Sequence, residues 1–258
     1  MKIGFFDSGI GGLTVLGEAI KRLPTHEYLY YADTYHAPYG PKPKEEVREY
    51  VMQAVEFLVR EGAEMVVIAC NTATSIAATE LRQMYSIPII GMEPAVKPAL
   101  ECVEKSQKRV LVTATPLTLK EEKLKQLIQR LDVHQQTDLL PLPDLVCFAE
   151  AGEFSDEVVL PYLTKALQPY QLAAYGAVVL GCTHFPLFIH QFEKFFSSEV
   201  QLIDGSHGTV SYLEKLMIER EGQPSLKPSV TFYRSGELVD QSEEINYFTH
   251  ILNHLKRS

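Results

Sequence analysis

Short apolar runs alternate along this chain with longer stretches that carry apolar residues at helical spacing. Runs of this kind suit strands buried on both faces of a parallel sheet, and the stretches between them suit helices that cover the sheet. The alternation therefore predicts an α/β fold built from βα units. The expected strands are 2–7, 28–33, 65–70, 88–92, 109–115, 138–142, 177–182 and 200–204.

Three of the longer stretches have an apolar stripe, and each stripe predicts an amphipathic helix that packs on a sheet. The stripes consist of Val47, Val51, Ala54, Val55 and Leu58; of Leu124, Leu127, Ile128 and Leu131; and of Ile245, Phe248, Leu252 and Leu255. One more strand is expected at 229–234, SVTFYR, as an antiparallel strand at a sheet edge.

Two segments of the first half of the chain recur in the second half. Residues 2–7 resemble 108–114, and residues 66–70 resemble 178–182, at offsets of 107 and 112 residues. Valine-rich strands can recur by chance, but the second pair of segments also matches a cysteine with a cysteine. The better interpretation is a duplication, with two pseudo-symmetric domains that each have a mostly parallel sheet flanked by helices.

The chain is expected to cross from one domain to the other near Pro94–Pro98 and to return near Gly205-Ser206. The first domain would then comprise residues 1–96 and 206–258, and the second residues 97–205. Ligands of open α/β sheets bind beyond the carboxyl ends of the strands, so both halves should present chemistry there.

Composition narrows the class of protein. The 258 residues are 46% apolar and 22% charged, which is typical of a soluble globular protein with a large core. The net charge of −9 argues against general binding to nucleic acid or to an anionic membrane. The N-terminus lacks the features of a signal peptide, and the longest apolar runs, such as 65–70, are too short to span a bilayer, so a cytoplasmic protein is expected.

The four cysteines form no CxxC pair and no zinc-type cluster, so no metal site is expected. Cys70 ends an apolar strand and is followed by Asn71-Thr72-Ala73-Thr74, a loop that enters a helix. A helix N-terminus lowers the pKa of a thiol, and the Asn and Thr side chains can bind a carboxylate. A lone cysteine is more often a packed core residue, and we interpret Cys102 and Cys147 as structural.

Cys182 has a matching context, because it also follows a Val-Val-Leu strand and is followed by Thr183 and His184. Pro186 suits the first turn of a helix. His184 could hold or exchange a proton with the thiol near neutral pH, or it could simply bond to the backbone at a helix start. The paired occurrence of Cys70 and Cys182 favours a catalytic role for both.

The loop Asp7-Ser8-Gly9-Ile10-Gly11-Gly12 follows the first strand and precedes a helix. It matches neither a P-loop nor a dinucleotide-binding GxGxxG. Asp7 could orient a proton or a substrate ammonium, or it could cap the following turn. Three other features are ambiguous by themselves: the loop around Tyr39 and Gly40, the threonines at 113, 115 and 118, and Glu150.

Taken together, these segments resemble the glutamate racemase family, within the aspartate/glutamate racemase superfamily. The matching motifs extend over most of the first 205 residues, in the order and spacing of the family. They are DSGIGG at 7–12, YYAD at 30–33, PYG at 38–40, CNTAT at 70–74, GMEP at 91–94 and GCTHFP at 181–186.

The resemblance implies racemisation of glutamate without PLP, metal or nucleotide, in a cleft between two pseudo-symmetric domains, and a supply of D-glutamate for peptidoglycan synthesis. It also implies that Cys70 and Cys182 are the two acid/base residues, with Asp7 assisting the first and His184 and Glu150 the second. The implied substrate contacts are Asp7, Ser8, Tyr39, Gly40, Asn71, Thr72, Thr183 and His184. A homodimer is common in the family and is the expected assembly.

Three alternatives remain open at this stage. A related racemase could act on aspartate or another acidic compound. Cys182 and His184 could form a hydrolytic pair, although a separation of two residues rarely gives that geometry and Cys70 would then have no role. A regulatory role such as inhibition of DNA gyrase, reported for some relatives, finds no support in basic or repetitive sequence.

Overall fold

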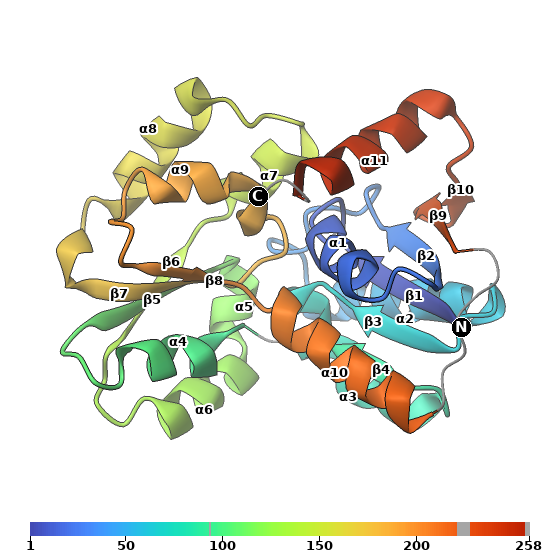
Figure 1. Cartoon of the computed structure of the whole chain (residues 1–258), viewed down its shortest axis with the longest axis horizontal. Helices are drawn as coiled ribbons and strands as arrows, with labels where there is room; N and C mark the ends of the chain where they lie inside the picture. Colours follow the sequence, from blue (N-terminus) through green and yellow to red (C-terminus); the bar gives the residue numbers. More distant parts are fainter. Residues whose placement is uncertain (93, 221–227, 256–258) are drawn as a thin grey trace. The chain divides into compact units, whose positions relative to one another are not determined.

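The computed structural model describes residues 1–92, 94–220 and 228–255, and the chain forms two compact units. The first unit is Met1–Met92 with Ser206–Ser258, and the second is Glu93–Gly205. In Figure 1 the first unit is blue to cyan and again orange to red, because the chain leaves this unit once and later returns to it. Glu93, part of the GMEP motif, lies outside the described residues.

A six-stranded sheet forms the centre of the first unit, in the order β10-β9-β2-β1-β3-β4. Its strands are β1 (Lys2–Asp7), β2 (Glu27–Ala32), β3 (Met65–Ile68), β4 (Ile89–Gly91), β9 (Ser229–Arg234) and β10 (Glu237–Leu238). All neighbouring strands are parallel except β9 and β10.

The strand predicted at 229–234 is present, but its predicted orientation and place are wrong. β9 pairs in parallel with β2, and β10 lies outside it at the edge of the sheet. The chain comes to β9 after helix α10 (Ser206–Glu219), and a helical connection of this kind allows a parallel strand. The short alternating run itself contains no information about the direction of its neighbour.

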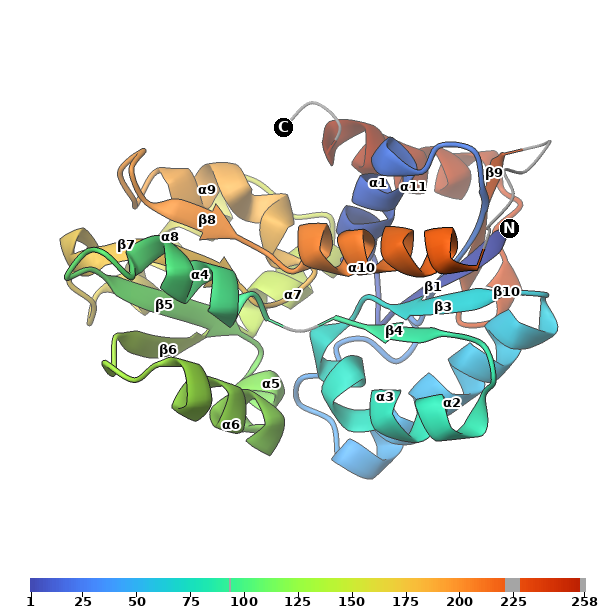
Figure 2. The same ribbon diagram turned by 60° about the horizontal axis from the view of Figure 1, so that its bottom comes forward.

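Helices cover both faces of this sheet. Figure 2 shows α1 (Leu13–Arg22), α10 and α11 (Ser242–Leu255) on one face, and α2 (Lys44–Arg60) and α3 (Asn71–Met84) on the other. The stripe predicted for α2 is confirmed, because all five of its apolar residues are buried.

The stripe predicted for α11 is partly wrong. Phe248 and Leu252 are buried as expected, but Ile245 is exposed and Ile251 is buried instead. The buried face of this helix therefore starts one turn later than the sequence suggested. The side chain of Leu255 lies outside the described part of the structure.

The second unit contains a four-stranded, wholly parallel sheet in the order β6-β5-β7-β8. Its strands are β5 (Arg109–Ala114), β6 (Thr137–Pro141), β7 (Tyr175–Leu180) and β8 (Gln201–Ile203). Its helices are α4 (Val96–Val103), α5 (Pro116–Lys120), α6 (Glu122–Leu131), α7 (Asp144–Glu150), α8 (Asp156–Leu167) and α9 (Ile189–Glu193), with the 3₁₀ turns η1 (Leu172–Ala174) and η2 (Phe185–Phe188).

In Figure 1, α4 and α6 cover one face of this sheet, and α8 and α9 cover the other. Of the stripe predicted for α6, only Leu124 is fully buried, while Leu127, Ile128 and Leu131 are half-buried at the rim. No helix in the described parts of either unit is long and apolar enough to cross a bilayer.

The two sheets share one strand order. β2-β1-β3-β4 in the first unit corresponds to β6-β5-β7-β8 in the second, counting strands along the chain. The segments that resemble each other in sequence are thus equivalent in topology, because β1 matches β5 and β3 matches β7. The predicted fold class, two α/β halves with mostly parallel sheets flanked by helices, is confirmed.

The strands before the two cysteines end two residues earlier than predicted, while the other predicted strand boundaries lie within two residues of those observed. The N–H of Ala69 makes one last ladder bond to the Phe6 carbonyl at 2.8 Å, and the N–H of Gly181 bonds in the same way to the Thr113 carbonyl at 2.8 Å. After that bond the chain turns, so Cys70 and Cys182 each lie just beyond a strand.

Candidate active site

In the first unit, the loop that follows β1 is built around a fully buried carboxylate. Asp7 Oδ1 accepts a hydrogen bond from the N–H of Gly9 at 3.0 Å, which is the turn-capping role expected as an alternative. Gly12, where the loop enters α1, has no room for a side chain, because a Cβ there would lie 2.5 Å from Asp7 Cβ. Gly12 therefore serves a close approach of the backbone to Asp7.

Cys70 is the N-cap residue of α3. Its backbone is extended, at φ −65° and ψ 120°, and its Sγ accepts a hydrogen bond from the N–H of Ala73 at 3.4 Å. The same sulfur lies 3.8 Å from Ser8 Oγ, so the loop after β1 and the start of α3 meet at this thiol. The positive end of a fourteen-residue helix favours the thiolate form.

The residues after Cys70 are the first turn of α3 and not the loop that was predicted. Asn71 and Thr72 are buried, and neither Oδ1 nor Nδ2 of Asn71 has a hydrogen-bond partner among the described residues. A buried amide without partners costs roughly 1–3 kcal/mol. An unpaired amide beside a thiol is therefore a candidate for binding a polar ligand.

Thr74 has a different role, because its Oγ1 donates to the Ile68 carbonyl and accepts from the N–H of Met92. It holds α3 against β3 and β4, so it is a structural residue.

Tyr39 is buried, and its hydroxyl donates a hydrogen bond of 2.5 Å to Asp33 Oδ2. Burial, followed by the charge of Asp33, raises the pKa of the Tyr39 phenol far above its usual value. The phenol therefore stays neutral, and its proton is engaged in the hydrogen bond to Asp33. No described residue accepts a hydrogen bond from the N–H groups of Tyr39 or Gly40, so the backbone of this loop is what can contact a ligand.

Asp33 is the residue that sequence analysis missed, since it entered only as the last letter of the YYAD motif. It lies directly after β2, as Asp7 lies at the end of β1, and its N–H donates to the Asp7 carbonyl at 3.0 Å. A carboxylate at the end of an otherwise apolar predicted strand, 28–33, was the available signal.

In the second unit, three side chains form a connected chain. Cys182 Sγ lies 3.6 Å from His184 Nδ1, and His184 Nε2 lies 2.6 Å from Oε1 of Glu150, the last residue of α7. Cys182 and His184 are buried and Glu150 is partly buried. Of the two interpretations of His184, the structure shows the contact with the thiol, because the turn before η2 folds the histidine back onto the sulfur.

The surroundings of His184 favour its charged form. Burial alone lowers the pKa of the imidazole, but hydrogen bonds to Cys182 and Glu150 and the charges of these groups raise it well above 6.5. The partners outweigh burial, because both ring nitrogens contact a group that can be anionic. A charged imidazole therefore lies 3.6 Å from the Cys182 sulfur.

The threonines near this group divide into two kinds. Thr113 Oγ1 donates to the Val179 carbonyl, and Thr115 is the N-cap of α5, with its Oγ1 accepting from the N–H of Thr118 at 3.3 Å. The hydrogen bonds described for Thr113, Thr115 and Thr118 are thus structural. Thr183 is buried, with Oγ1 3.5 Å from His184 Nδ1, so it belongs to the thiol group.

The candidate residues thus form two groups, one in each unit. Asp7, Ser8, Cys70, Asn71 and Thr72 lie close together around the start of α3, and Tyr39 belongs to the same buried cluster as Cys70. Cys182, Thr183, His184 and Glu150 form the second group. Cys102 and Cys147 are exposed, so neither has the core-packing role that a structural cysteine implies.

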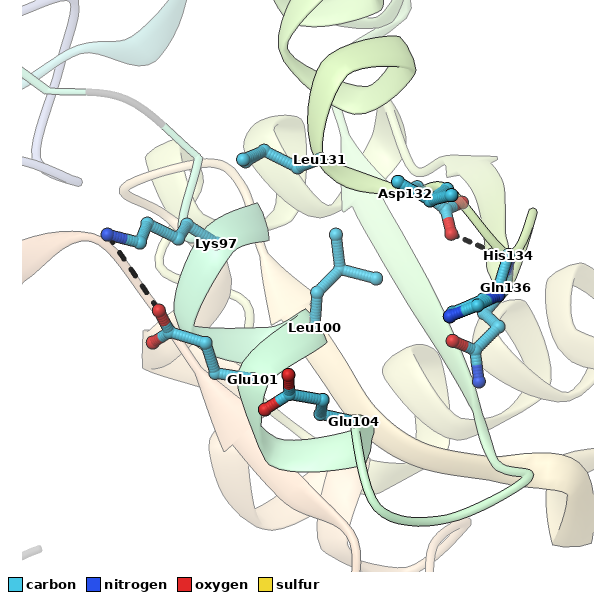
Figure 3. A pocket seen from close by; sticks show the side chains of 9 residues that line it. Lys97, Leu100, Glu101, Glu104, Leu131, Asp132, His134 and Gln136 are labelled. Atoms are coloured by element: carbon cyan, nitrogen blue, oxygen red, sulfur yellow. Dashed lines mark hydrogen bonds and ion pairs between the residues drawn. The ribbon is translucent and has the colours of Figure 1, made fainter.

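Two surface cavities lie away from these groups. One of about 270 Å³ is lined by residues of α4, of the end of α6 and of the turn that follows it (Figure 3), including the ion-paired Lys97 and Glu101 and the carboxylate of Asp132. The other, of about 660 Å³, lies at the amino ends of β7 and β8. Neither is lined by a candidate residue. The described residues include no cluster of three or more His, Cys, Asp or Glu suited to a metal ion.

Comparison with known proteins assigns the chain to a family. The sequence model for "Asp/Glu/Hydantoin racemase" matches residues 14–213. "Glutamate racemase 2" of Bacillus subtilis (strain 168) is 49% identical over 261 aligned positions, covering 100% of this chain and 98% of the relative.

Two solved structures agree in fold. The glutamate racemase of Campylobacter jejuni superimposes with a TM-score of 0.80 at 30% identity and covers 98% of both chains. The Escherichia coli glutamate racemase, solved with L-glutamate and the activator UDP-MurNAc-ala, gives a TM-score of 0.78 at 30% identity, over 91% of this chain and 90% of that one. The family resemblance inferred from the motifs is confirmed, and the chain is an isomerase that belongs to the Asp/Glu/Hydantoin racemase family.

Proposed function

We propose that this chain interconverts L-glutamate and D-glutamate by a two-base mechanism, with Cys70 and Cys182 as the two proton-transfer groups. The observation that supports it most directly is the equivalence of the two thiols. Each is buried, each follows the matching strand of a matching sheet, and each has its own stabilising partner.

Inversion of a stereocentre requires proton removal on one face of Cα and proton delivery on the other. One thiolate takes the α-proton, and the electron pair of the C–H bond stays on Cα and its carboxylate. The opposite thiol then gives its proton to Cα and becomes a thiolate. The reverse direction exchanges the roles of Cys70 and Cys182, so a full cycle moves protons but changes no oxidation state.

The remaining candidate residues bind and orient the substrate in this proposal. The unpaired amide of Asn71, the hydroxyls of Ser8, Thr72 and Thr183, and the N–H groups of Tyr39 and Gly40 are polar groups for the carboxylates. Asp7 accepts a hydrogen bond from the substrate ammonium or exchanges a proton near Cys70. These donors also stabilise charge that develops on the carboxylate as the α-proton leaves.

The two thiolates are stabilised by different means. Cys70 receives a backbone N–H and the N-terminal end of α3, which carry a partial positive charge at every pH. Cys182 has the His184–Glu150 pair, and the positive charge of this pair's imidazole is lost when the ring deprotonates. His184 and Glu150 are thus positioning and electrostatic partners of the second thiol. The location expected for the site, between the two halves, stays a prediction, as do the domain limits 1–96 with 206–258 and 97–205.

The experiment is incubation of each glutamate enantiomer with the protein in D2O, followed by chiral separation and mass spectrometry of the product. We expect interconversion in both directions with deuterium at Cα. Cys70→Ser and Cys182→Ser should each abolish racemisation, while Cys102→Ser and Cys147→Ser, which change exposed thiols, should retain wild-type turnover. Wild-type turnover by either variant of the first pair would contradict the mechanism.

A hydrolytic role for Cys182 has one specific observation in its favour, because the Cys182–His184–Glu150 contacts are those of a nucleophile, a base and an orienting carboxylate. That function would show thioester hydrolysis that survives Cys70→Ser. Activity on aspartate above that on glutamate would favour the related racemase instead.

Assembly and location complete the proposal. We propose a homodimer in the cytoplasm that supplies D-glutamate for peptidoglycan synthesis. Light scattering of the purified protein should give twice the mass of the chain, which is 29.1 kDa, and a monomer at assay concentration would refute the dimer.

A further inference from the structure

Asp33 holds together several parts of the first unit. It is buried, and its Oδ2 accepts from the Tyr39 hydroxyl at 2.5 Å while its Oδ1 accepts from Ser235 Oγ at 2.8 Å. His36 Nδ1 lies 2.8 Å from the same Oδ1. The N–H of Asp33 donates to the Asp7 carbonyl. Through its backbone N–H and its carboxylate, this one residue connects the end of β1, the Tyr39 loop and a distant part of the chain.

That distant part is the turn between β9 and β10. Ser235 and Gly236 have positive φ angles of 45° and 92°, as a tight antiparallel turn requires. The N–H of Ser235 donates to the Ala32 carbonyl at 2.8 Å, and its Oγ accepts from the N–H of Tyr35 at 3.1 Å. The turn therefore contacts the segment after β2 through both backbone and side chain.

A second contact supports the same connection. The hydroxyl of Tyr35 donates to Glu237 Oε2 of β10 at 3.0 Å. The hairpin that the sequence left without a function thus contacts the segment that begins at Asp33 and includes the Tyr39 loop, at positions about 200 residues apart. Figure 1 shows this hairpin on the side of the sheet where β2 lies, and β9 pairs with β2 while β10 lies outside β9.

We propose that Asp33 and Ser235 are positioning residues, which fix the Pro38-Tyr39-Gly40 segment beside Cys70 so that its N–H groups are ordered before substrate binds. The inference rests on the proposed racemase function and assigns a role to the C-terminal hairpin. Neither residue touches the reacting atoms. A loop without helix or strand loses conformational entropy when a ligand orders it, so ordering it in advance lowers KM.

Two variants test the carboxylate and the hydroxyl separately. Asp33→Asn keeps the shape but leaves one acceptor oxygen for the Tyr39 and Ser235 hydroxyls, beside the ring of His36. Ser235→Gly removes the hydroxyl at a position where glycine adopts the positive φ without strain, so folding should be retained. Tyr28→Phe is the matched control, because it deletes the partly buried hydrogen bond of Tyr28 to the Leu23 carbonyl, at the opposite end of β2.

We expect KM for both enantiomers to rise about tenfold in each test variant, the factor of one lost hydrogen bond to a charged group, with kcat changed by less than about threefold. Tyr28→Phe should leave KM unchanged. Unchanged KM in both test variants, the same KM increase in Tyr28→Phe, or a fall in kcat without a rise in KM would each overturn the positioning role.

A second measurement separates this inference from the proposed function. If the Tyr39 segment packs over Cys70 only when Asp33 and Ser235 hold it, alkylation of Cys70 by iodoacetamide should be faster in both test variants. Alkylation of Cys182, which belongs to the other unit, serves as the internal standard and should not change. Equal Cys70 rates in wild type and variants would refute the inference even if the protein racemises glutamate, and faster rates would support it even if it does not.

Discussion

Glu150→Gln is the most informative single change, because it removes one negative charge from His184 and keeps the size of the side chain. In the wild-type chain the Glu150 carboxylate lies 2.6 Å from Nε2 and is one reason why the pKa of His184 is well above 6.5. The glutamine oxygen can still accept a hydrogen bond from Nε2–H, so the loss is that of the charge and not of the bond.

The size of the effect follows from that difference. A hydrogen bond to a charged group contributes roughly 1.5–3 kcal/mol and a neutral one about 0.5–1.5 kcal/mol, so the change costs about 1–1.5 kcal/mol of preference for the imidazolium. One pKa unit corresponds to about 1.4 kcal/mol. Glu150→Gln should therefore lower the pKa of His184 by about one unit.

The sign of the pH effect follows from the direction of the shift. A raised pKa means that the protonated imidazole is the stabilised form, and that form is lost as the pH rises through the pKa. The basic limb of kcat/KM against pH should report the loss of this imidazolium and move to lower pH by about one unit in Glu150→Gln. The shift must be the same in both directions, because the two enantiomers have equal free energy in water.

The assay is initial-rate racemisation across the alkaline range, with circular dichroism of the purified protein at each pH to verify folding. Glu153→Gln is the matched control, because Glu153 lies three residues away and hydrogen-bonds Ser155. A basic limb that does not move in Glu150→Gln, or that moves as far in Glu153→Gln, would refute the proposed role of the carboxylate.

Two further predictions follow from contacts at the site. Asn71→Ala removes a buried amide that has no partner among the described residues, so the free energy of unfolding should stay the same or rise, while KM rises about tenfold; a large loss of stability in chemical denaturation would contradict this. Gly181→Ala puts a Cβ 2.5 Å from the Thr113 carbonyl oxygen and should lower both kcat and stability, the latter by about 1–3 kcal/mol. Gly208→Ala, in α10 with nothing within 4 Å, is its control and should be neutral or stabilising.

Much of this fold could be predicted because strands of parallel sheets are buried on both faces and therefore form continuous apolar runs. The apolar runs do not show at which residue the hydrogen bonds between neighbouring strands stop. Ala69 and Cys70 are as apolar as the strand before them, yet the chain turns after a single bond from Ala69 to Phe6. Strand ends are set by the neighbouring strand, which the local pattern does not describe.

The partner of β9 was also outside the reach of local pattern. The run 229–234 is correct to the residue, but its register beside β2 depends on the connection through α10 and on the burial of Phe232 and Tyr233. Pairing between residues about 200 positions apart is a property of the folded chain.

The candidate site also divides into features that the local sequence shows and contacts that it does not show. Cys70 and Cys182 could be found because each combines an apolar strand with polar residues that follow at once. The contact between Cys182 and His184 was one of two interpretations of His184, since spacing alone does not show that a turn folds the ring back onto the sulfur. Asp33 was missed because its partners, Tyr39 and Ser235, come from different segments of the chain.

The duplicated sheets stabilise their thiols unequally, and this has a consequence for catalysis. The amide at Cys70 acts at every pH, whereas His184 and Glu150 act on Cys182 only while the imidazole is protonated. A change at Glu150 therefore affects the proton transfers of one thiol and leaves those of the other intact. The ratio kcat/KM must stay equal for the two enantiomers. A difference between the two thiols can therefore change kcat and KM for each enantiomer separately, and it can change the rate of α-deuterium exchange measured before product accumulates. We expect Glu150→Gln to slow exchange from one enantiomer more than from the other, and equal slowing of both would mean that the two thiols share their electrostatic support.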